Sequence, residues 1–136
     1  MNRQHQWARD TFVRVQHARD LTEEWTIADR DQYRTFCRQL PVLFRRSGLA
    51  QSLTYLNSRN DNRGGAVLRD VASVYGTTAI ALVPRVVGTD ERPVPVADYL
   101  IVSRDLIAIA GWFRRFADSV LPAPETSDSE GAEEAR

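Results

Sequence analysis

Apolar residues recur at intervals of three and four positions along most of this chain, and the strict alternation of a half-buried strand persists nowhere. Clear stripes begin at Trp7, Tyr33 and Tyr99. This spacing places apolar side chains on one face of a helix, and that face must be buried against other helices. The sequence therefore predicts an all-α fold, a single bundle of about five to six helices.

Caps and helix breakers divide the chain into these helices. We expect helices over about 7–25, 33–46, 49–56, 67–75 and 96–121, the last being the longest. Asp29 or Asp31 can cap the second helix. Pro41 is expected to kink this helix, and Gly48 to end it in a left-handed conformation. Asp61 or Asn62 is the expected cap of the fourth helix.

The segment before the last helix is less regular. Residues 80–83 fit either a strand or one buried helical turn. A connecting loop is expected around Pro84, Gly88 and Pro93, and Pro95 can open the final helix. The predicted core stripe of that helix is Tyr99, Leu100, Leu106, Ile107, Ala110, Phe113, Phe116, Ala117 and Val120.

The length and composition indicate one domain. We expect a helical domain over residues 1–121 and a disordered acidic tail over residues 122–136. The single cysteine, Cys37, leaves no disulfide framework and no cysteine-based metal site. No signal-peptide core precedes the first helix, and no apolar stretch is long enough to span a bilayer. These features predict a cytoplasmic protein that does not enter a membrane.

The charge is balanced overall but unevenly distributed. All 18 basic residues are arginine, and 18 acidic residues bring the formal net charge to zero. Residues 1–121 hold 17 arginines and 13 acidic residues, a net charge of +4. A basic body with an acidic tail is compatible with binding a polyanion such as RNA. The alternative is that the arginines are simply solvated, and are frequent because a GC-rich genome favours arginine codons.

The residues that commonly carry catalysis are poorly placed for it. His5 and His17 lie twelve residues apart, about 120° out of phase round a helix, so they do not face one ligand. Cys37 lies within an apolar stripe, as a buried structural thiol would. Gly64-Gly65 lacks the lysine of a phosphate-binding loop. We therefore expect no catalytic site, no metal and no cofactor.

Arginines beside aromatic residues are the best candidates for a binding surface. Guanidinium groups make forked hydrogen bonds to phosphate and stack on bases. On the last helix, a line of small residues flanked by arginines would let another backbone approach closely. The alternative is helix packing with surface ion pairs, such as Arg104–Asp105 and Arg114–Asp118. The expected RNA-binding residues are Arg38, Arg45, Arg46, Arg59, Arg63, Arg114 and Arg115, and the expected subunit interface is Arg104, Ala108, Gly111 and Trp112.

Two blocks of the sequence follow a family pattern. The first runs from an early helix, Gln6 to Ala18, through Leu40-Pro41 to Gly48-Leu49 and an apolar helix ending at Leu56. The second begins with Tyr99-Leu100 and Ser103-Arg104 and closes with Trp112-Phe113-Arg114-Arg115-Phe116-Ala117. In order and separation these blocks resemble the small subunit of the CRISPR-associated type III-B Cmr effector complex.

The resemblance implies a non-catalytic, all-α subunit of a ribonucleoprotein in antiviral defence. Such subunits form a minor filament with neighbouring copies of themselves, beside the backbone subunit and the large subunit. Their basic faces border the crRNA–target RNA duplex and contact target RNA mainly through its backbone. The resemblance does not transfer individual RNA contacts, so the arginines above rest on charge and placement.

Three competing interpretations remain open at this point. The small subunit of a type III-A complex is also helical. A metal-dependent ribonuclease could use Glu23, Glu24, Asp29 and Asp31 to hold Mg²⁺. A stand-alone DNA-binding protein would need a recognition helix after Gly48, where the sequence places an apolar helix instead.

Overall fold

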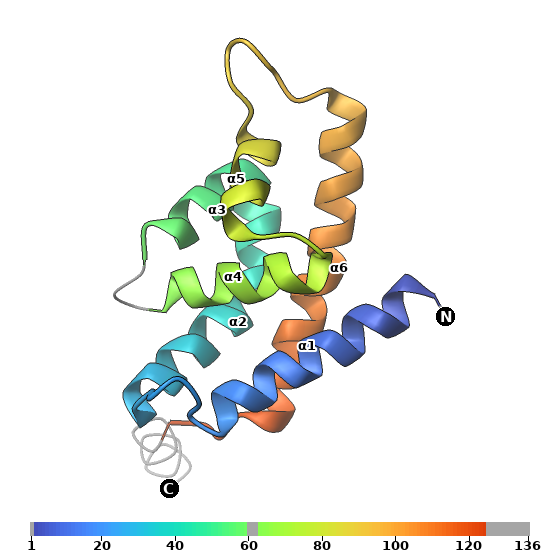
Figure 1. The fold of residues 1–136 in the computed structure, drawn as a ribbon. Helices are drawn as coiled ribbons and strands as arrows, with labels where there is room; N and C mark the ends of the chain where they lie inside the picture. The colour runs from blue at the N-terminus through green and yellow to red at the C-terminus, as the bar shows by residue number, and fades with distance from the viewer. Residues whose placement is uncertain (1, 60–62, 125–136) are drawn as a thin grey trace, which may run out of the picture.

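The fold is known from a computed structural model, which describes residues 2–59 and 63–124. Six helices and no strand occur in these residues, so the all-α prediction is confirmed. The predicted caps Asp61 and Asn62, and most of the predicted acidic tail, lie outside the described residues. Figure 1 shows the helices α1 (Arg3–Arg19), α2 (Ile27–Ser47), α3 (Leu49–Asn57), α4 (Gly64–Tyr75), α5 (Ala79–Val87) and α6 (Val96–Val120).

The start of α2 is fixed by a reciprocal cap. The Thr26 hydroxyl accepts a hydrogen bond from the backbone N–H of Asp29, and the Asp29 carboxylate accepts one from the backbone N–H of Thr26. The prediction that Asp29 or Asp31 is the capping residue is therefore wrong. Asp29 instead lies three positions inside the helix, where its carboxylate completes a capping box.

A single residue connects α2 to α3. α2 continues through the buried Pro41 to Ser47, and Gly48 is both its C-cap and the N-cap of α3. Gly48 has the expected positive φ of 77°, but its ψ of 162° is extended, so the left-handed helical stop is wrong. The extended ψ turns the chain directly into α3, which leaves no loop between the two helices.

The ambiguous segment at 80–83 belongs to a helix. The Thr78 hydroxyl caps α5 by accepting a hydrogen bond from the backbone N–H of Ala81. Pro84 lies inside α5 and not in the connecting loop, which corrects the prediction. The stabilisation from the Thr78 cap and from burial of Leu82 and Val86 exceeds the cost of the helix hydrogen bond that Pro84 cannot donate.

The core is organised around α6, which packs chiefly against α1 and α2. Its buried stripe includes Leu106, Ile109 and Phe113, all fully inaccessible to solvent. Leu100, which we expected in this stripe, is 61% exposed, and Val102 is buried instead. The reason is visible in Figure 1, where the first turns of α6 extend past α1 and so have no helix to cover their outer face.

The length and hydropathy of the described helices bear on whether one could cross a bilayer. None of them is by itself both long enough and apolar enough to cross a membrane. α4 and α5 would reach that length only as a pair, and the two are bent by 86° relative to each other.

Candidate nucleic-acid interface

A basic surface extends from α2 to the residues just after α3. Between Gln32 and Arg59 the sequence contains five arginines and no acidic residue. Four of these arginines are exposed, while Arg34 is half-buried. The exposed four are Arg38, Arg45, Arg46 and Arg59, which we call the α2–α3 arginine face. A run of this length without acidic residues gives a surface suited to an anionic partner.

A groove of about 630 Å³ opens on this face. Its lining combines two guanidinium groups, an amide, a hydroxyl, an aromatic ring and two aliphatic side chains. These belong to Arg38, Gln39, Val42, Leu43, Arg46, Ser47 and Tyr55. Such a mixture of apolar and polar side chains is typical of sites that bind a small ligand group.

Tyr55 is the aromatic residue of this groove, and the sequence interpretation missed it. Its side chain is 38% exposed. The Arg59 guanidinium carbon lies 5.2 Å from the centre of the Tyr55 ring, and the Phe36 ring centre lies 6.3 Å from it. Helical spacing could not have predicted this contact, because Arg59 lies beyond the end of α3 at Asn57.

Arg38 is partly engaged by an acidic residue of α6. The Arg38 Nε atom lies 2.8 Å from the Asp118 carboxylate, and an Arg34 nitrogen lies 3.9 Å from the same oxygen. The alternative pairing of Asp118 with Arg114 is therefore wrong, since Asp118 turns to α2. Arg114 is exposed one helical turn before Asp118, so it extends the basic surface from α2 onto α6.

The structure does not bring Arg63 to this groove. The Arg63 Nε atom lies 3.1 Å from the Asp29 carboxylate, and its guanidinium lies over the Trp25 ring at 5.2 Å. These contacts join the residue before α4 to the start of α2. Arg63 therefore has a packing role that competes with RNA contact, and the remaining arginines are the stronger candidates.

Arg115 faces a different side of α6 from Arg114, because successive residues are about 100° apart on a helix. The Arg115 guanidinium lies 5.1 Å from the centre of the Trp112 ring. The Trp112 indole N–H donates to the Gln4 side chain of α1 at 3.3 Å, and its ring stacks on Phe116. Arg115 and Trp112 therefore lie where α6 meets α1.

The residues of the predicted subunit interface form a strip along α6, in which Trp112 also contacts α1. Arg104 is exposed and lies 3.5 Å from Asp105, the ion pair expected in the alternative interpretation. Ala108 and Gly111 are half-buried. A Cβ atom added at Gly111 would meet no heavy atom within 4 Å, apart from its chain neighbours and the backbone of its own helix. Gly111 therefore leaves space that a partner could enter.

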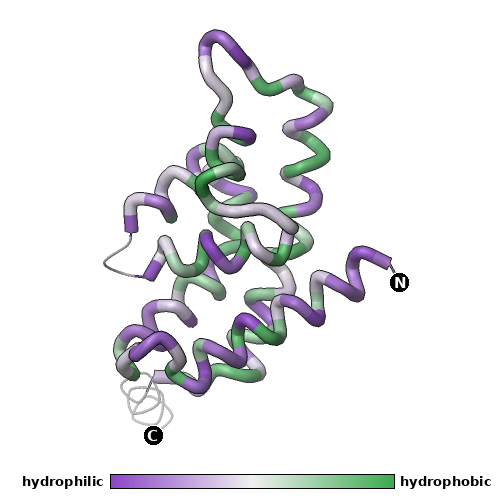
Figure 2. The backbone as a smooth tube through the Cα atoms, viewed as in Figure 1, coloured by the Kyte–Doolittle hydropathy of each residue, from purple (hydrophilic) through white to green (hydrophobic). Residues whose placement is uncertain are grey.

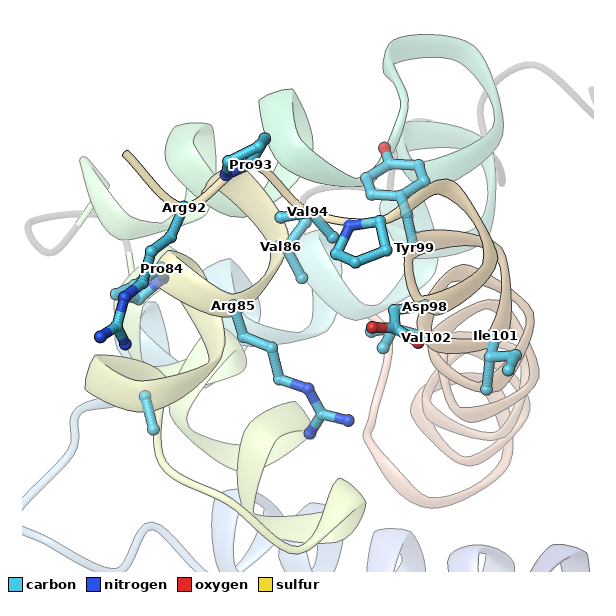
Figure 3. A pocket seen from close by; sticks show the side chains of 12 residues that line it. Pro84, Arg85, Val86, Arg92, Pro93, Val94, Asp98, Tyr99, Ile101 and Val102 are labelled. Carbon is cyan, nitrogen blue, oxygen red and sulfur yellow. The ribbon is translucent and has the colours of Figure 1, made fainter. Parts of the chain in front are cut away.

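A second hollow, of about 670 Å³, lies between α5, the chain before α6, and α6 itself (Figure 3). Arg85 reaches it from α5 and Asp98 from α6, and prolines and valines supply most of the remaining lining. Close to it, the first turns of α6 expose Val96, Leu100 and Ile101. Figure 2 shows this end of α6 as a largely hydrophobic segment. Exposed apolar residues gathered at one end of a molecule mark sites of protein contact.

The start of α3 is capped from α6. Gly48 has no side chain to satisfy the first N–H groups of α3. The Tyr99 hydroxyl accepts hydrogen bonds from the backbone N–H groups of Leu49, at 3.1 Å, and Ala50, at 3.4 Å. Tyr99 therefore fixes the start of α3, the helix that carries Tyr55.

The buried titratable groups serve the core. The Tyr33 hydroxyl donates to the Asp70 carboxylate at 2.6 Å, and burial raises the pKa of Tyr33 well above its usual range. Burial also raises the pKa of the Cys37 thiol well above 9.0, which keeps it protonated. The buried structural thiol expected from the sequence is confirmed.

Two of the four acidic residues of the ribonuclease interpretation are held in other contacts. Glu23 pairs with Arg69 at 3.2 Å, and Asp29 pairs with Arg63 and Thr26. Across residues 2–59 and 63–124, no three histidine, cysteine or acidic side chains come together as metal ligands.

Comparison with known families gives the identity of the fold. The sequence pattern of the CRISPR-associated protein family Cas_Cmr5 matches residues 3–120, from the first residue of α1 to the last of α6. The chain belongs to the Cmr5 family. The resemblance drawn from the two sequence blocks is therefore confirmed. The Cmr5 match ends before the acidic tail.

Two findings from Thermus thermophilus support the same assignment. A protein described as CRISPR system Cmr subunit Cmr5 is 30% identical over 115 residues, which cover 85% of this chain and 92% of the relative. The crystal structure of a CRISPR-associated Cmr5 family protein superposes with a TM-score of 0.78 at 29% identity. That superposition covers 90% of this chain and 99% of the other.

Proposed function

We propose that this Cmr5 family protein is a non-catalytic structural subunit of a type III-B Cmr ribonucleoprotein. In that complex it contacts target RNA through the α2–α3 arginine face, in cytoplasmic antiviral defence. The relative from Thermus thermophilus is described as a subunit of the Cmr system, which supports the assembly. The observation that carries the RNA contact is the stretch of sequence from Gln32 to Arg59, which holds five arginines and no acidic residue.

Contact through phosphate suits a subunit that must serve any guide sequence. Arginine forks bind phosphate oxygens and carry no base information, so the same surface accepts every target. The isolated chain should bind RNA weakly, because residues 1–121 carry a net charge of only +4. Assembly beside other subunits raises the effective concentration of RNA at this face.

The protein contacts are assigned to α6. The strip formed by Arg104, Ala108, Gly111 and Trp112 is proposed to meet a neighbouring subunit, because Gly111 leaves open space for a close approach. The exposed apolar end of α6 offers a second contact. The proposed partners are the backbone subunit, the large subunit and neighbouring copies of this chain in a minor filament.

A non-catalytic role is supported by where the reactive side chains lie. The Cys37 thiol is buried and protonated, and the Tyr33–Asp70 pair is enclosed in the core. Glu23 and Asp29 are held in ion pairs with arginines. The chemistry of the complex is therefore assigned to other subunits.

The test is charge reversal within the assembled complex. The variant Arg45→Glu/Arg46→Glu places two carboxylates on the arginine face. Target RNA capture should fall about tenfold or more, and the slope of log K against log salt should decrease by about 2, roughly one for each lost phosphate contact. Arg9→Glu/Arg19→Glu makes the same change in charge at exposed positions of α1 and should leave capture unchanged.

Incorporation of each variant into the complex must be measured alongside RNA capture. Co-purification of the other subunits with a tagged variant establishes assembly. A reversed variant that assembles normally and captures RNA as well as the wild type would refute the proposed RNA contact.

A further inference from the structure

We infer that the groove beside Tyr55 binds an unpaired nucleotide, with the base against the Tyr55 ring and the phosphate against Arg38 and Arg46. This inference rests on the proposed function and deepens it, because it names the form of RNA that the arginine face receives. A face that contacts only the phosphates of a duplex needs only positive charge. This groove also has an aromatic ring, aliphatic side chains and uncharged polar groups.

The lining separates into parts that match the parts of a nucleotide. Val42 and Leu43 provide aliphatic surface, and Tyr55 provides an aromatic ring. Gln39 and Ser47 add polar groups that can donate to or accept from the edge of a base. Arg38 and Arg46 lie on the same lining, where they can reach a phosphate.

The aromatic residue is positioned for stacking. Tyr55 is partly exposed, and the Arg59 guanidinium already lies over its ring. Proteins that bind single-stranded RNA stack bases on aromatic rings and on arginine planes in this manner. A paired base has both faces covered by its neighbours in the helix, so only an unpaired base can use the ring.

A neighbouring hollow gives the strand a path. This hollow, of about 230 Å³, is lined by Leu43, Ser47, Gln51 and Tyr55, so it shares three residues with the main groove. Tyr55 therefore borders both hollows. A strand that places one base in the main groove can continue past Tyr55 without leaving the surface.

The charge of the groove favours RNA over a protein partner. The groove lining contains two arginines and no acidic residue. Asp118, the carboxylate that reaches Arg38, comes from α6 and lies outside the lining. Phosphate groups can pair with Arg46 and share Arg38 with Asp118, whereas an apolar peptide segment would bring no charged partner to either guanidinium group.

The first experiment measures binding of the full chain to three fluorescent RNAs at low salt. The probes are an oligouridine single strand, the same strand with one abasic position at its centre, and a duplex of equal length. Tyr55→Leu should weaken binding of the intact single strand about fivefold or more, and should leave duplex binding unchanged. Tyr55→Phe keeps the ring and should bind as the wild type does.

The two proposals fail in different ways in this experiment. If Arg45→Glu/Arg46→Glu weakens every RNA and Tyr55→Leu weakens none, the backbone contact stands and the nucleotide groove is refuted. If the wild-type chain binds the abasic strand as tightly as the intact strand, the groove is refuted again. If Tyr55→Leu weakens no RNA and Arg45→Glu/Arg46→Glu leaves RNA capture by the assembled complex unchanged, both proposals fail.

A second measurement locates the base directly. Target RNA carrying one 4-thiouridine is bound to the assembled complex and irradiated. An unpaired 4-thiouridine should crosslink to the peptide that contains Tyr55, and pairing that nucleotide should remove the crosslink. A crosslink from the paired nucleotide only would overturn the inference. So would the absence of a crosslink at Tyr55 together with displacement of the RNA by an acidic peptide, because the groove would then bind protein.

Discussion

The hydroxyl oxygen of Tyr99 lies 3.1 Å from the backbone nitrogen of Leu49. This contact joins the two sequence blocks that indicated the family, because Gly48-Leu49 belongs to the first block and Tyr99-Leu100 to the second. A helix leaves its first N–H groups without intrahelical partners. Tyr99 satisfies two of those groups in α3, which explains why two segments fifty residues apart form one pattern.

Tyr99→Phe should destabilise the chain by about 1 kcal/mol, since it removes the only side-chain oxygen that contacts these two N–H groups among the described residues. Urea denaturation followed by circular dichroism measures this change. Tyr55→Phe removes a hydroxyl from an exposed ring and should shift stability by less than about 0.5 kcal/mol. Equal effects of the two substitutions would refute the capping role.

Substitutions at Gly111 should have opposite effects on the free chain and on the complex. Gly111→Ala should stabilise the free chain by roughly 0.5–1 kcal/mol, because alanine loses less backbone entropy in a helix and the added methyl meets no neighbour. Gly111→Leu should fold normally and weaken co-purification with other subunits, because its side chain fills the strip. Thermal unfolding and tagged pull-downs provide the two readouts.

The control for the Gly111 prediction is Ser119→Leu, which adds a similar side chain at an exposed position near the end of α6. It should leave assembly intact. Normal assembly of Gly111→Leu, or equal loss of assembly in both variants, would remove this strip from the interface.

The stability of the chain should depend on pH through Asp29. The hydrogen bond from the Thr26 backbone, followed by that from Arg63, lowers the pKa of Asp29 below its ordinary value of 3.8. A lowered pKa means that the ionised carboxylate stabilises the fold above pH 3.8, and that this contribution is lost as pH falls through the lowered pKa. Asp29→Asn should therefore differ most from the wild type near neutral pH.

Urea midpoints measured from neutral pH down to about pH 2 test this dependence. The difference between wild type and Asp29→Asn should narrow as pH falls below 3.8. Asp31→Asn makes the same chemical change two residues along α2, away from the Thr26 and Arg63 contacts. A difference that stayed constant over the whole pH range would show that Asp29 acts by hydrogen bonding independent of its charge.

The helices were predicted well because their positions follow from the spacing of apolar residues close together in the sequence. The stripes around Phe36 and Phe113, and the short helix starting at Leu49, follow from spacing alone. Leu100 was misplaced because burial depends on how far the neighbouring helices extend, and spacing does not contain that length. Asp118 was paired with Arg114, four residues earlier on α6, whereas the fold brings Arg38 to it from α2.

The candidate site was predicted in part for the same reason. Arg45 and Arg46 stand out in the sequence, and the structure places them on an exposed face with Arg38 and Arg59. The groove beside Tyr55 was not predictable from spacing, because it exists only where α2 and α3 meet. Arg63 looked equivalent to the other arginines until the fold placed Asp29 beside it.

The one-residue connection at Gly48 has a consequence for how this surface can change over time. Helices in bundles are usually joined by about two to eight residues, which absorb insertions without disturbing what they connect. Here an added residue would have to enter α2 or α3, and it would rotate everything beyond it by about 100°. Arg46 and Tyr55 would then face different directions. The surface can diversify by exchanging side chains, while the length of this segment is constrained.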